Sequence, residues 1–123
     1  SPLNQSETNL DLALRLGVEL VVVASGRIGM INHTLLTVNF ARNMGLAVVG
    51  VIINTHGVHR VGVGERSNPD ELQRLCQVPI LGSLPWIDGV DVGKGQFMGL
   101  VQQIRRRIDF ETLLGDDKPD WTC

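Results

Sequence analysis

A short loop, Ser25-Gly26-Arg27-Ile28-Gly29, carries the backbone and side-chain pattern in this sequence that best suits the binding of an anion. If a helix begins directly after the loop, unpaired backbone N–H groups face outward at its positive end, where anions bind. Arg27 adds a full charge and a planar pair of donors that fits a carboxylate or a phosphate. The alternative is that the glycines only make a tight turn and that Arg27 is solvated, because glycine is common in such turns.

The segments on either side of this loop predict the elements that would position it. Residues 20–24 are a continuous apolar run rich in β-branched side chains, typical of a strand buried on both faces. Residues 31–44 repeat apolar side chains at helical spacing, with Asn32 as a candidate N-cap and Gly45 just past the end. Residues 48–53 form a second apolar run. This order predicts two parallel strands joined by a right-handed helical crossover.

Two further helices are predicted on either side of this unit. Before the first strand, a short helix capped by a Ser or Thr ends at Gly17, and it would pack on the sheet. After the second strand, Asn68 and Pro69 are typical of a helix start. That helix runs to about Cys76, with Leu72, Leu75 and Cys76 facing inward.

The remaining segments complete a predicted α/β domain over residues 1–123. Residues 78–82 are a very short third strand, and residues 83–86 are the loop beyond it. Residues 96–108 repeat apolar side chains at helical spacing and predict a closing helix, whereas residues 115–123 are a polar, flexible tail. The alternation of strands and helices predicts a parallel sheet with helices on both faces. The carboxyl ends of its strands would then bring the arginine loop, Asn54 and residues 83–86 to one edge.

Other motifs do not add chemistry. His56 and His59 supply at most half of a zinc site, and no Cys or acidic partner stands at a standard spacing. Lys94 lies between two glycines, but Gly95 replaces the hydroxyl residue that a phosphate-binding loop needs after its lysine. The run Arg105-Arg106-Arg107 is expected to be a solvated helix face. We therefore predict no catalytic residue and no metal ligand in this chain.

The composition is typical of a cytoplasmic protein domain. The chain has 123 residues and a formal net charge of −2, and it lacks the basic blocks that favour nucleic-acid binding. No apolar run approaches the length of a membrane span, and no signal peptide is present, so we expect no membrane partner. The two cysteines, Cys76 and Cys123, form no disulfide framework and suit a reducing compartment.

Several stretches resemble the dethiobiotin synthetase family. The word Gly26-Arg27-Ile28-Gly29-Met30-Ile31-Asn32-His33-Thr34-Leu35-Leu36-Thr37 is similar to the family's G-x-[LI]-G-x-I-N-H-x-[LM]-L-T segment. The stretches Gly45-Leu46-Ala47 and Gly50-Val51-Ile52-Ile53-Asn54 follow as in the family, and residues 78–86 resemble its P-x-L-G-x-[IL]-P-W word. The opening Ser1-Pro2-Leu3 resembles the segment after the family's acidic, glycine-rich strand end. The similarity spans roughly residues 1–86.

This resemblance implies a P-loop-NTPase-like fold and a role in biotin biosynthesis. The family closes the ureido ring of dethiobiotin from 7,8-diaminononanoate, carbon dioxide and ATP, with Mg²⁺. One amine of the substrate captures carbon dioxide as a carbamate, a carbamate oxygen takes the γ-phosphate, and the second amine then displaces phosphate. Catalysis of this kind depends on positioning and on neutralising phosphate charge.

The resemblance also implies two binding segments in this chain. Arg27, Ile28, Gly29, Met30, Ile31 and Asn32 would hold the substrate carboxylate across the two-fold interface of a homodimer. Asn54, Ser83, Leu84, Pro85 and Trp86 would hold the adenine, whose edge suits an Asn amide because that amide donates and accepts hydrogen bonds at once.

The departures from the family pattern are large. The family's Walker A Lys and Ser/Thr, a further lysine and the acidic magnesium ligand all precede the segment that matches Ser1. We therefore expect this chain to be the carboxyl-terminal half of such an enzyme, either as a fragment, as one half of a split or clipped enzyme, or as a truncated paralogue. We expect it to be inactive alone and to form a homodimer or pair with an amino-terminal half. The alternative is a non-catalytic, P-loop-like regulatory or interaction domain of the type fused to phosphotransacetylases.

Overall fold

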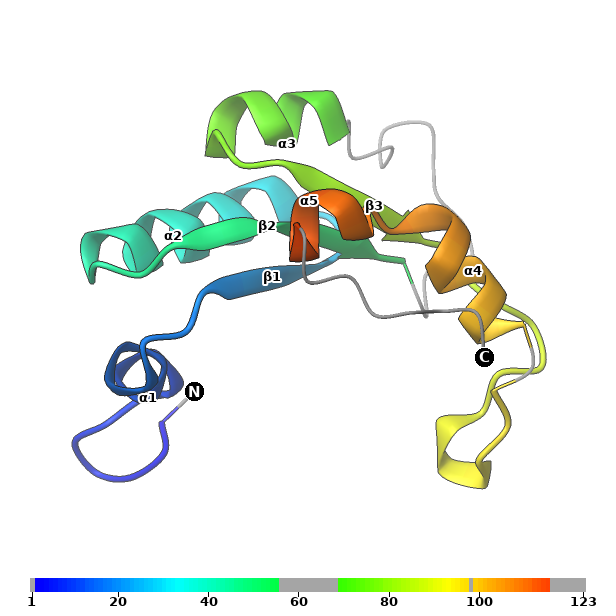
Figure 1. Ribbon diagram of the computed structural model, residues 1–123, viewed down its shortest axis with the longest axis horizontal. Coiled ribbons are helices and arrows are strands. Elements are labelled where there is room, and N and C mark those ends of the chain that lie inside the picture. The colour runs from blue at the N-terminus through cyan, green and yellow to red at the C-terminus, as the bar shows by residue number, and fades with distance from the viewer. Residues whose placement is uncertain (1, 56–68, 98, 116–123) are drawn as a thin grey trace.

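Three parallel strands form the centre of the computed structural model, which describes residues 2–55, 69–97 and 99–115. Strands β1 (Leu20–Ser25), β2 (Val48–Asn54) and β3 (Ile80–Leu84) form one sheet in the order β1-β2-β3. Both pairings are parallel, so the predicted strand-helix-strand unit is confirmed (Figure 1). The helices are α1 (Asn9–Leu16), α2 (Met30–Asn43), α3 (Pro69–Cys76), the 3₁₀ turn η1 (Val92–Lys94), α4 (Leu100–Arg107) and α5 (Phe110–Leu114).

Helices lie on both faces of the sheet, as the sequence predicts. On one face α2 and α3 cover the strands, whereas α5 packs on β2 and β3, and α4 on β3, from the other side (Figure 1). The core between the sheet and α2 and α3 consists of buried side chains from all these elements: Ala24, Met30, Val38, Val51, Ile53, Leu72, Cys76 and Val78. The α/β fold class is therefore confirmed.

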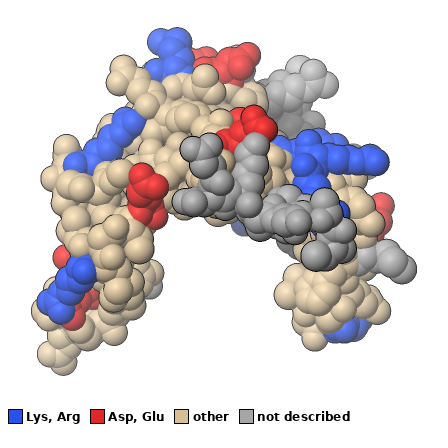
Figure 2. Space-filling model, viewed as in Figure 1, with Lys and Arg blue, Asp and Glu red and all other residues tan. Residues whose placement is uncertain are grey.

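Strand β1 differs from its prediction, because it is not buried on both faces. Ala24 is buried on the side of α2, but Val21 and Val23 on the other side are 37% and 63% exposed. The reason is that α4 and α5 cover β2 and β3, and no element in the described ranges covers this face of β1. Strand β1 is also an edge strand of the sheet. Its outer edge faces the open space beneath the arch-shaped molecule (Figures 1 and 2).

Helix α2 begins one residue earlier than predicted. Its N-cap is Gly29, which has φ 86°, and His33 N–H donates to the Gly29 carbonyl at 3.0 Å. Asn32 is therefore inside the first turn, and its prediction as the N-cap is wrong. A glycine takes this left-handed conformation without a steric penalty. Gly29 can therefore end the loop and serve as the N-cap, the role that was predicted for Asn32. At the other end, Gly45 follows the helix with φ 88°, as predicted.

Helix α1 ends at Gly17 and has Thr8 as its N-cap, in agreement with the sequence. The Asp11 carboxylate accepts hydrogen bonds from the Thr8 hydroxyl and backbone N–H, both at 2.7 Å. These two hydrogen bonds lower the pKa of Asp11, and the bond from the Thr8 hydroxyl contributes more than the bond from the backbone N–H. Helix α1 packs at the amino end of the sheet, where Ala13 forms a small second core with Ala41 and Leu46.

Helix α3 is anchored to α2 by one side chain. The Arg42 guanidinium donates from Nη1 to the Cys76 carbonyl at 2.7 Å and from Nη2 to the Gln77 carbonyl at 2.8 Å. Leu72 and Cys76 are fully buried as predicted, but Leu75 is 38% exposed, so its inward placement is wrong. Leu75 lies beside the stripe that faces the sheet, not within it. The predicted cap Asn68 lies outside the described residues.

The carboxyl-terminal part departs most from the sequence predictions. Strand β3 continues through Ser83 and Leu84, which pair with Ile53 and Asn54, so these two residues are not in a loop. Helix α4 begins at Leu100 and not near residue 96, because Gly99 precedes it with φ 76°. Helix α5 is short and was not predicted. Residues 116–123 lie outside the described part, and the predicted tail and single-domain boundary stay predictions.

Candidate functional site

The ends of all three strands meet at one edge of the sheet, as predicted. Ser25 pairs with Asn54, and Asn54 pairs with Leu84. Beyond these pairs, Gly26 N–H donates to the Asn54 carbonyl at 2.9 Å and Thr55 N–H donates to the Leu84 carbonyl at 2.9 Å. The arginine loop and the two segments proposed for adenine are thus joined by consecutive backbone hydrogen bonds.

The turn before α2 keeps the donors that an anion site needs. Two of its N–H groups are used internally, from Arg27 to the Ser25 carbonyl at 2.8 Å and from Met30 to the Arg27 carbonyl at 3.0 Å. Four others have no hydrogen-bond acceptor within the described ranges: those of Ile28, Gly29, Ile31 and Asn32. The exposed Arg27 side chain also has no partner there. This arrangement can bind a carboxylate or a phosphate.

The side chains of this turn do not all face the same way. Ile28 is 79% exposed, and Asn32 is exposed on the outer surface of α2. Met30 is 4% exposed and belongs to the core, and Ile31 packs against that core. Six residues were predicted to bind the substrate carboxylate. Two of them, Met30 and Ile31, can offer a ligand their backbone N–H groups more readily than their side chains.

A hollow of about 410 Å³ lies beside this turn, between β1 and α2. Its lining combines an apolar strand wall with polar side chains from the loop and the helix: Val22, Val23, Ala24, Ser25, Arg27, Ile28, Met30, His33, Thr34 and Thr37. Thr34 is 3% exposed, and its hydroxyl makes no hydrogen bond in the described structure. The sequence prediction missed His33, Thr34 and Thr37 as lining residues, although they belong to the same family-like word.

A second hollow, of about 220 Å³, contains three of the five residues predicted for adenine. Asn54, Leu84 and Pro85 line it, together with the apolar residues Ile87, Val90, Val92 and Leu100. This volume is below the roughly 300–1,000 Å³ of sites that enclose a whole small ligand. The hollow could therefore hold one ring system and not a complete nucleotide.

Ser83 and Trp86 are not among the residues that line the second hollow. The Trp86 indole N–H donates to the Asp88 carboxylate at 2.8 Å, so it is engaged within its own loop. Sequence reasoning missed the apolar lining residues. Their signal was the presence of Ile87, Val90 and Val92 in a segment otherwise rich in Gly and Asp.

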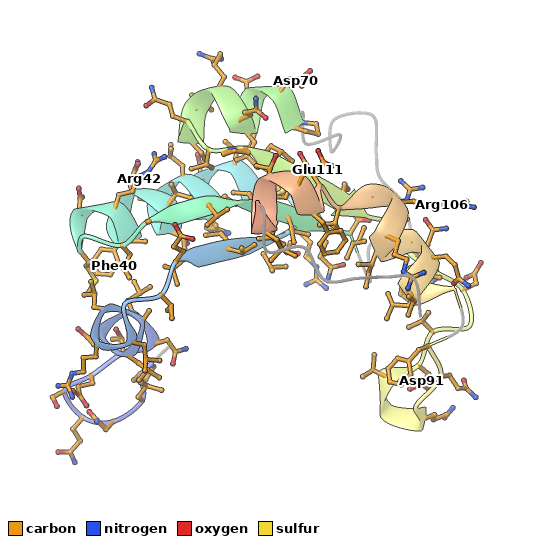
Figure 3. All side chains as sticks on the ribbon, in the orientation of Figure 1. Phe40, Arg42, Asp70, Asp91, Arg106 and Glu111 are labelled. Carbon is orange, nitrogen blue, oxygen red and sulfur yellow. The ribbon has the colours of Figure 1, made fainter. Side chains whose placement is uncertain are left out.

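Within the described residues, the remaining motifs do not line either hollow. Lys94 pairs with Asp91 at 3.3 Å within the η1 loop, and Asp91 also accepts from the Lys94 backbone N–H. The arginines of α4 are exposed, and Arg106 extends away from the sheet in Figure 3. His56 and His59 lie outside the described residues. In the described ranges, no three His, Cys, Asp or Glu side chains group to hold a metal, and no helix has the length and apolarity to cross a bilayer.

Comparison with known proteins identifies the class of this fold and site. A sequence model of the family described as an AAA domain matches residues 1–93. This range includes all three strands and all the residues named above as lining the two hollows, with the exception of Leu100. The chain belongs to this AAA domain family, and its parallel sheet is P-loop-NTPase-like.

The similar curated proteins are ATP-dependent dethiobiotin synthetases. The chain is 40% identical to that of Bacillus velezensis over 114 residues, which is 92% of this chain and 46% of the relative. It is 45% identical to that of Bacillus subtilis strain 168 over 76 residues, 61% of this chain and 32% of the relative. The enzyme of Thermodesulfovibrio yellowstonii is 34% identical over 120 residues, 92% of this chain and 48% of the relative. The resemblance drawn from the sequence is therefore confirmed, and the matched part of the chain spans between about a third and a half of the length of these relatives.

Proposed function

We propose that this chain is the substrate-carboxylate and adenine-binding part of an enzyme that makes dethiobiotin in biotin biosynthesis. The observation that supports this most is the junction of the two segments at one sheet edge. On one side are Arg27 and four N–H groups without an acceptor among the described residues, and on the other is the hollow at Asn54. The similarity to ATP-dependent dethiobiotin synthetases supplies the reaction. The substrates would be 7,8-diaminononanoate, carbon dioxide and ATP.

In this proposal the chain positions reactants and leaves the phosphate chemistry to other parts of the enzyme. The turn from Arg27 to Asn32 holds the carboxylate of 7,8-diaminononanoate, which fixes where its two amines lie. The hollow at Asn54 holds the adenine of ATP. Bound ATP would supply the phosphoryl group that activates the carbamate, and Mg²⁺ would neutralise its phosphates. The described residues offer no grouped metal ligands, so the proposal assigns no magnesium ligand to them.

Two surfaces support the proposed partners. On α2, the side chains of Leu36 and Phe40 are 68% and 58% exposed, and they continue from Asn32 at four-residue spacing (Figure 3 labels Phe40). Such a stripe suits a helix covered by a second protomer, in keeping with a homodimer. On the other side, one edge of β1 has no strand partner in the described part of the chain, and it suits a further strand from an amino-terminal half. We further propose that the protein acts in the cytoplasm.

The test is an assay of the full-length protein that contains this chain. We expect dethiobiotin to form from 7,8-diaminononanoate, bicarbonate and ATP in the presence of Mg²⁺, with no product when any one component is omitted. Mass spectrometry of the product provides the measurement. A full-length protein that binds adenosine and dimerises but forms no dethiobiotin would instead support the regulatory or interaction domain.

The chain alone is expected to bind ATP weakly and no better than adenosine. A few exposed hydrogen bonds contribute about 1 kcal/mol each, whereas micromolar binding requires about 8 kcal/mol. Most nucleotide affinity in P-loop proteins comes from the phosphates, which a Gly-rich loop, a lysine and Mg²⁺ hold. Calorimetric titration with ATP and adenosine, with and without Mg²⁺, measures this. Tight, Mg²⁺-dependent binding of ATP would show that a phosphate site exists within this chain.

A further inference from the structure

Thr55, the first residue after β2, contacts the end of β3 and the residue that directly follows β1. Its backbone N–H and its Oγ1 hydroxyl both donate to the Leu84 carbonyl oxygen, at 2.9 and 2.8 Å. On the opposite side its Cγ2 methyl lies against Gly26, where a Cβ atom would be only 2.6 Å from that methyl. One side chain thus has a polar group on the adenine side and an apolar group on the carboxylate side.

We propose that Thr55 is a positioning residue for both binding segments, through two separate atoms. The hydroxyl fixes the carbonyl of Leu84 and with it the wall of the smaller hollow. The methyl fixes Gly26 and therefore the start of the turn that carries Arg27. This inference rests on the proposed function, because it takes the two hollows to be the nucleotide and substrate sites.

The hydrogen bonds at Leu84 determine how the hollow can recognise a ring. A carbonyl oxygen has two lone pairs, and Thr55 occupies both of them. The Leu84 carbonyl therefore gives the hollow its shape and accepts no hydrogen bond from a ligand. Among the described residues that line the hollow, Asn54 is the one with a polar side chain. Its placement depends on the same strand end, because Asn54 pairs with Leu84.

The close packing at Gly26 explains why the methyl matters. The hypothetical Cβ at Gly26 would also lie 3.3 Å from both Cα and Cβ of Thr55. Gly26 N–H in turn donates to the carbonyl of Asn54, directly before Thr55. Because β-branched Thr is restricted at χ1, its hydroxyl and methyl are held in these two directions together. Removal of the hydroxyl or of the methyl should therefore alter the geometry of one hollow more than that of the other.

Two substitutions separate these roles in the full-length protein. Thr55→Val keeps the methyl on Gly26 and removes the hydroxyl, and we expect it to raise the KM for ATP about fivefold with the KM for 7,8-diaminononanoate unchanged. Thr55→Ser keeps the hydroxyl and removes the methyl, and we expect a several-fold rise in the KM for 7,8-diaminononanoate with that for ATP unchanged. Steady-state kinetics with each substrate varied in turn measures both constants.

The pattern of the two variants tests the inference. A residue with only a structural role would change both constants and the thermal midpoint together, in both variants, and that result would overturn the proposal. An unchanged KM for ATP in Thr55→Val would do the same. Failure of the wild-type protein to form dethiobiotin would instead contradict the proposed function, and the inference with it. Active wild-type protein with two kinetically unaltered variants contradicts the inference alone.

A second measurement tests the methyl contact without any ligand. Gly26→Ala alone should lower the urea midpoint of unfolding, because its Cβ would collide with the Thr55 methyl. Combined with Thr55→Ser, the same change should lower the midpoint less, since the nearest atoms would then be 3.3 Å away. Equal losses from Gly26→Ala in both backgrounds would show that the methyl does not fix the turn.

Discussion

Gly82→Ala is expected to destabilise the protein by about 3 kcal/mol, enough to lower its melting temperature by roughly 10 °C. A Cβ at Gly82 would lie 2.0 Å from the Arg107 carbonyl oxygen and 2.9 Å from its carbon. These are backbone atoms at the end of α4, so no side chain can turn away to make room. The junction of α4 and α5, which is tied to β3 by a 2.7 Å hydrogen bond from Asp109 N–H to the Leu81 carbonyl, would have to move.

Thermal and urea unfolding monitored by circular dichroism measure this loss. Gly93→Ala is the matched control, because its nearest neighbour, Asp91 Oδ1, would be 3.4 Å away and the site is exposed. The control should unfold within about 0.5 kcal/mol of the wild type. Equal stability of the two variants would mean that α4 and α5 do not pack on β3 as closely as the structure has them.

Arg27→Ala in the full-length protein is expected to raise the KM for 7,8-diaminononanoate about tenfold and to leave the KM for ATP unchanged. Hydrogen bonds to charged groups contribute about 1.5–3 kcal/mol when well formed, and 1.4 kcal/mol corresponds to a factor of ten. The lower end applies because Arg27 is exposed and competes with water. The turn's unpaired N–H groups would remain, so binding should weaken and not disappear.

Steady-state kinetics with Arg27→Lys and Arg106→Ala completes this experiment. Lysine keeps the charge and loses the planar pair of donors, so its KM should fall between those of the wild type and the alanine variant. Arg106 is also an exposed arginine, but it belongs to α4 and to neither proposed binding segment, so its removal should change neither constant. A rise in the KM for ATP alone would indicate that the turn serves a phosphate and not a carboxylate.

The sequence predicted the elements whose pattern is local. Strands β1 and β2 are continuous apolar runs, and α2 has helical spacing with Gly45 at its end, so each was placed to within a residue or two. The meeting of Gly26, Asn54 and residues 83–86 at one edge followed from parallel strands alone. Binding by these residues stays a prediction, which the experiments above test.

The features that sequence could not predict depend on partners elsewhere in the chain. Val23 has the side chain of a buried strand residue and is exposed, because burial on that face needs an element that packs there. Ser83 and Leu84 are in β3 because their backbones pair with β2, which no side-chain pattern records. Helix α5 has only five residues, too few for a period, and its start depends on the Asp109 cap to Thr112 N–H at 3.0 Å.

Cys76, the last residue of α3, is fully buried, and its thiol can therefore report on local unfolding of this helix. Burial raises the pKa of the Cys76 thiol, and the nearby charge of Arg42 opposes this only in part. Since the thiolate is the reactive form, an alkylating reagent can modify Cys76 only when α3 separates from the sheet. The rate of that modification thus reports how often the helix opens, at a point next to the two carbonyls that Arg42 holds.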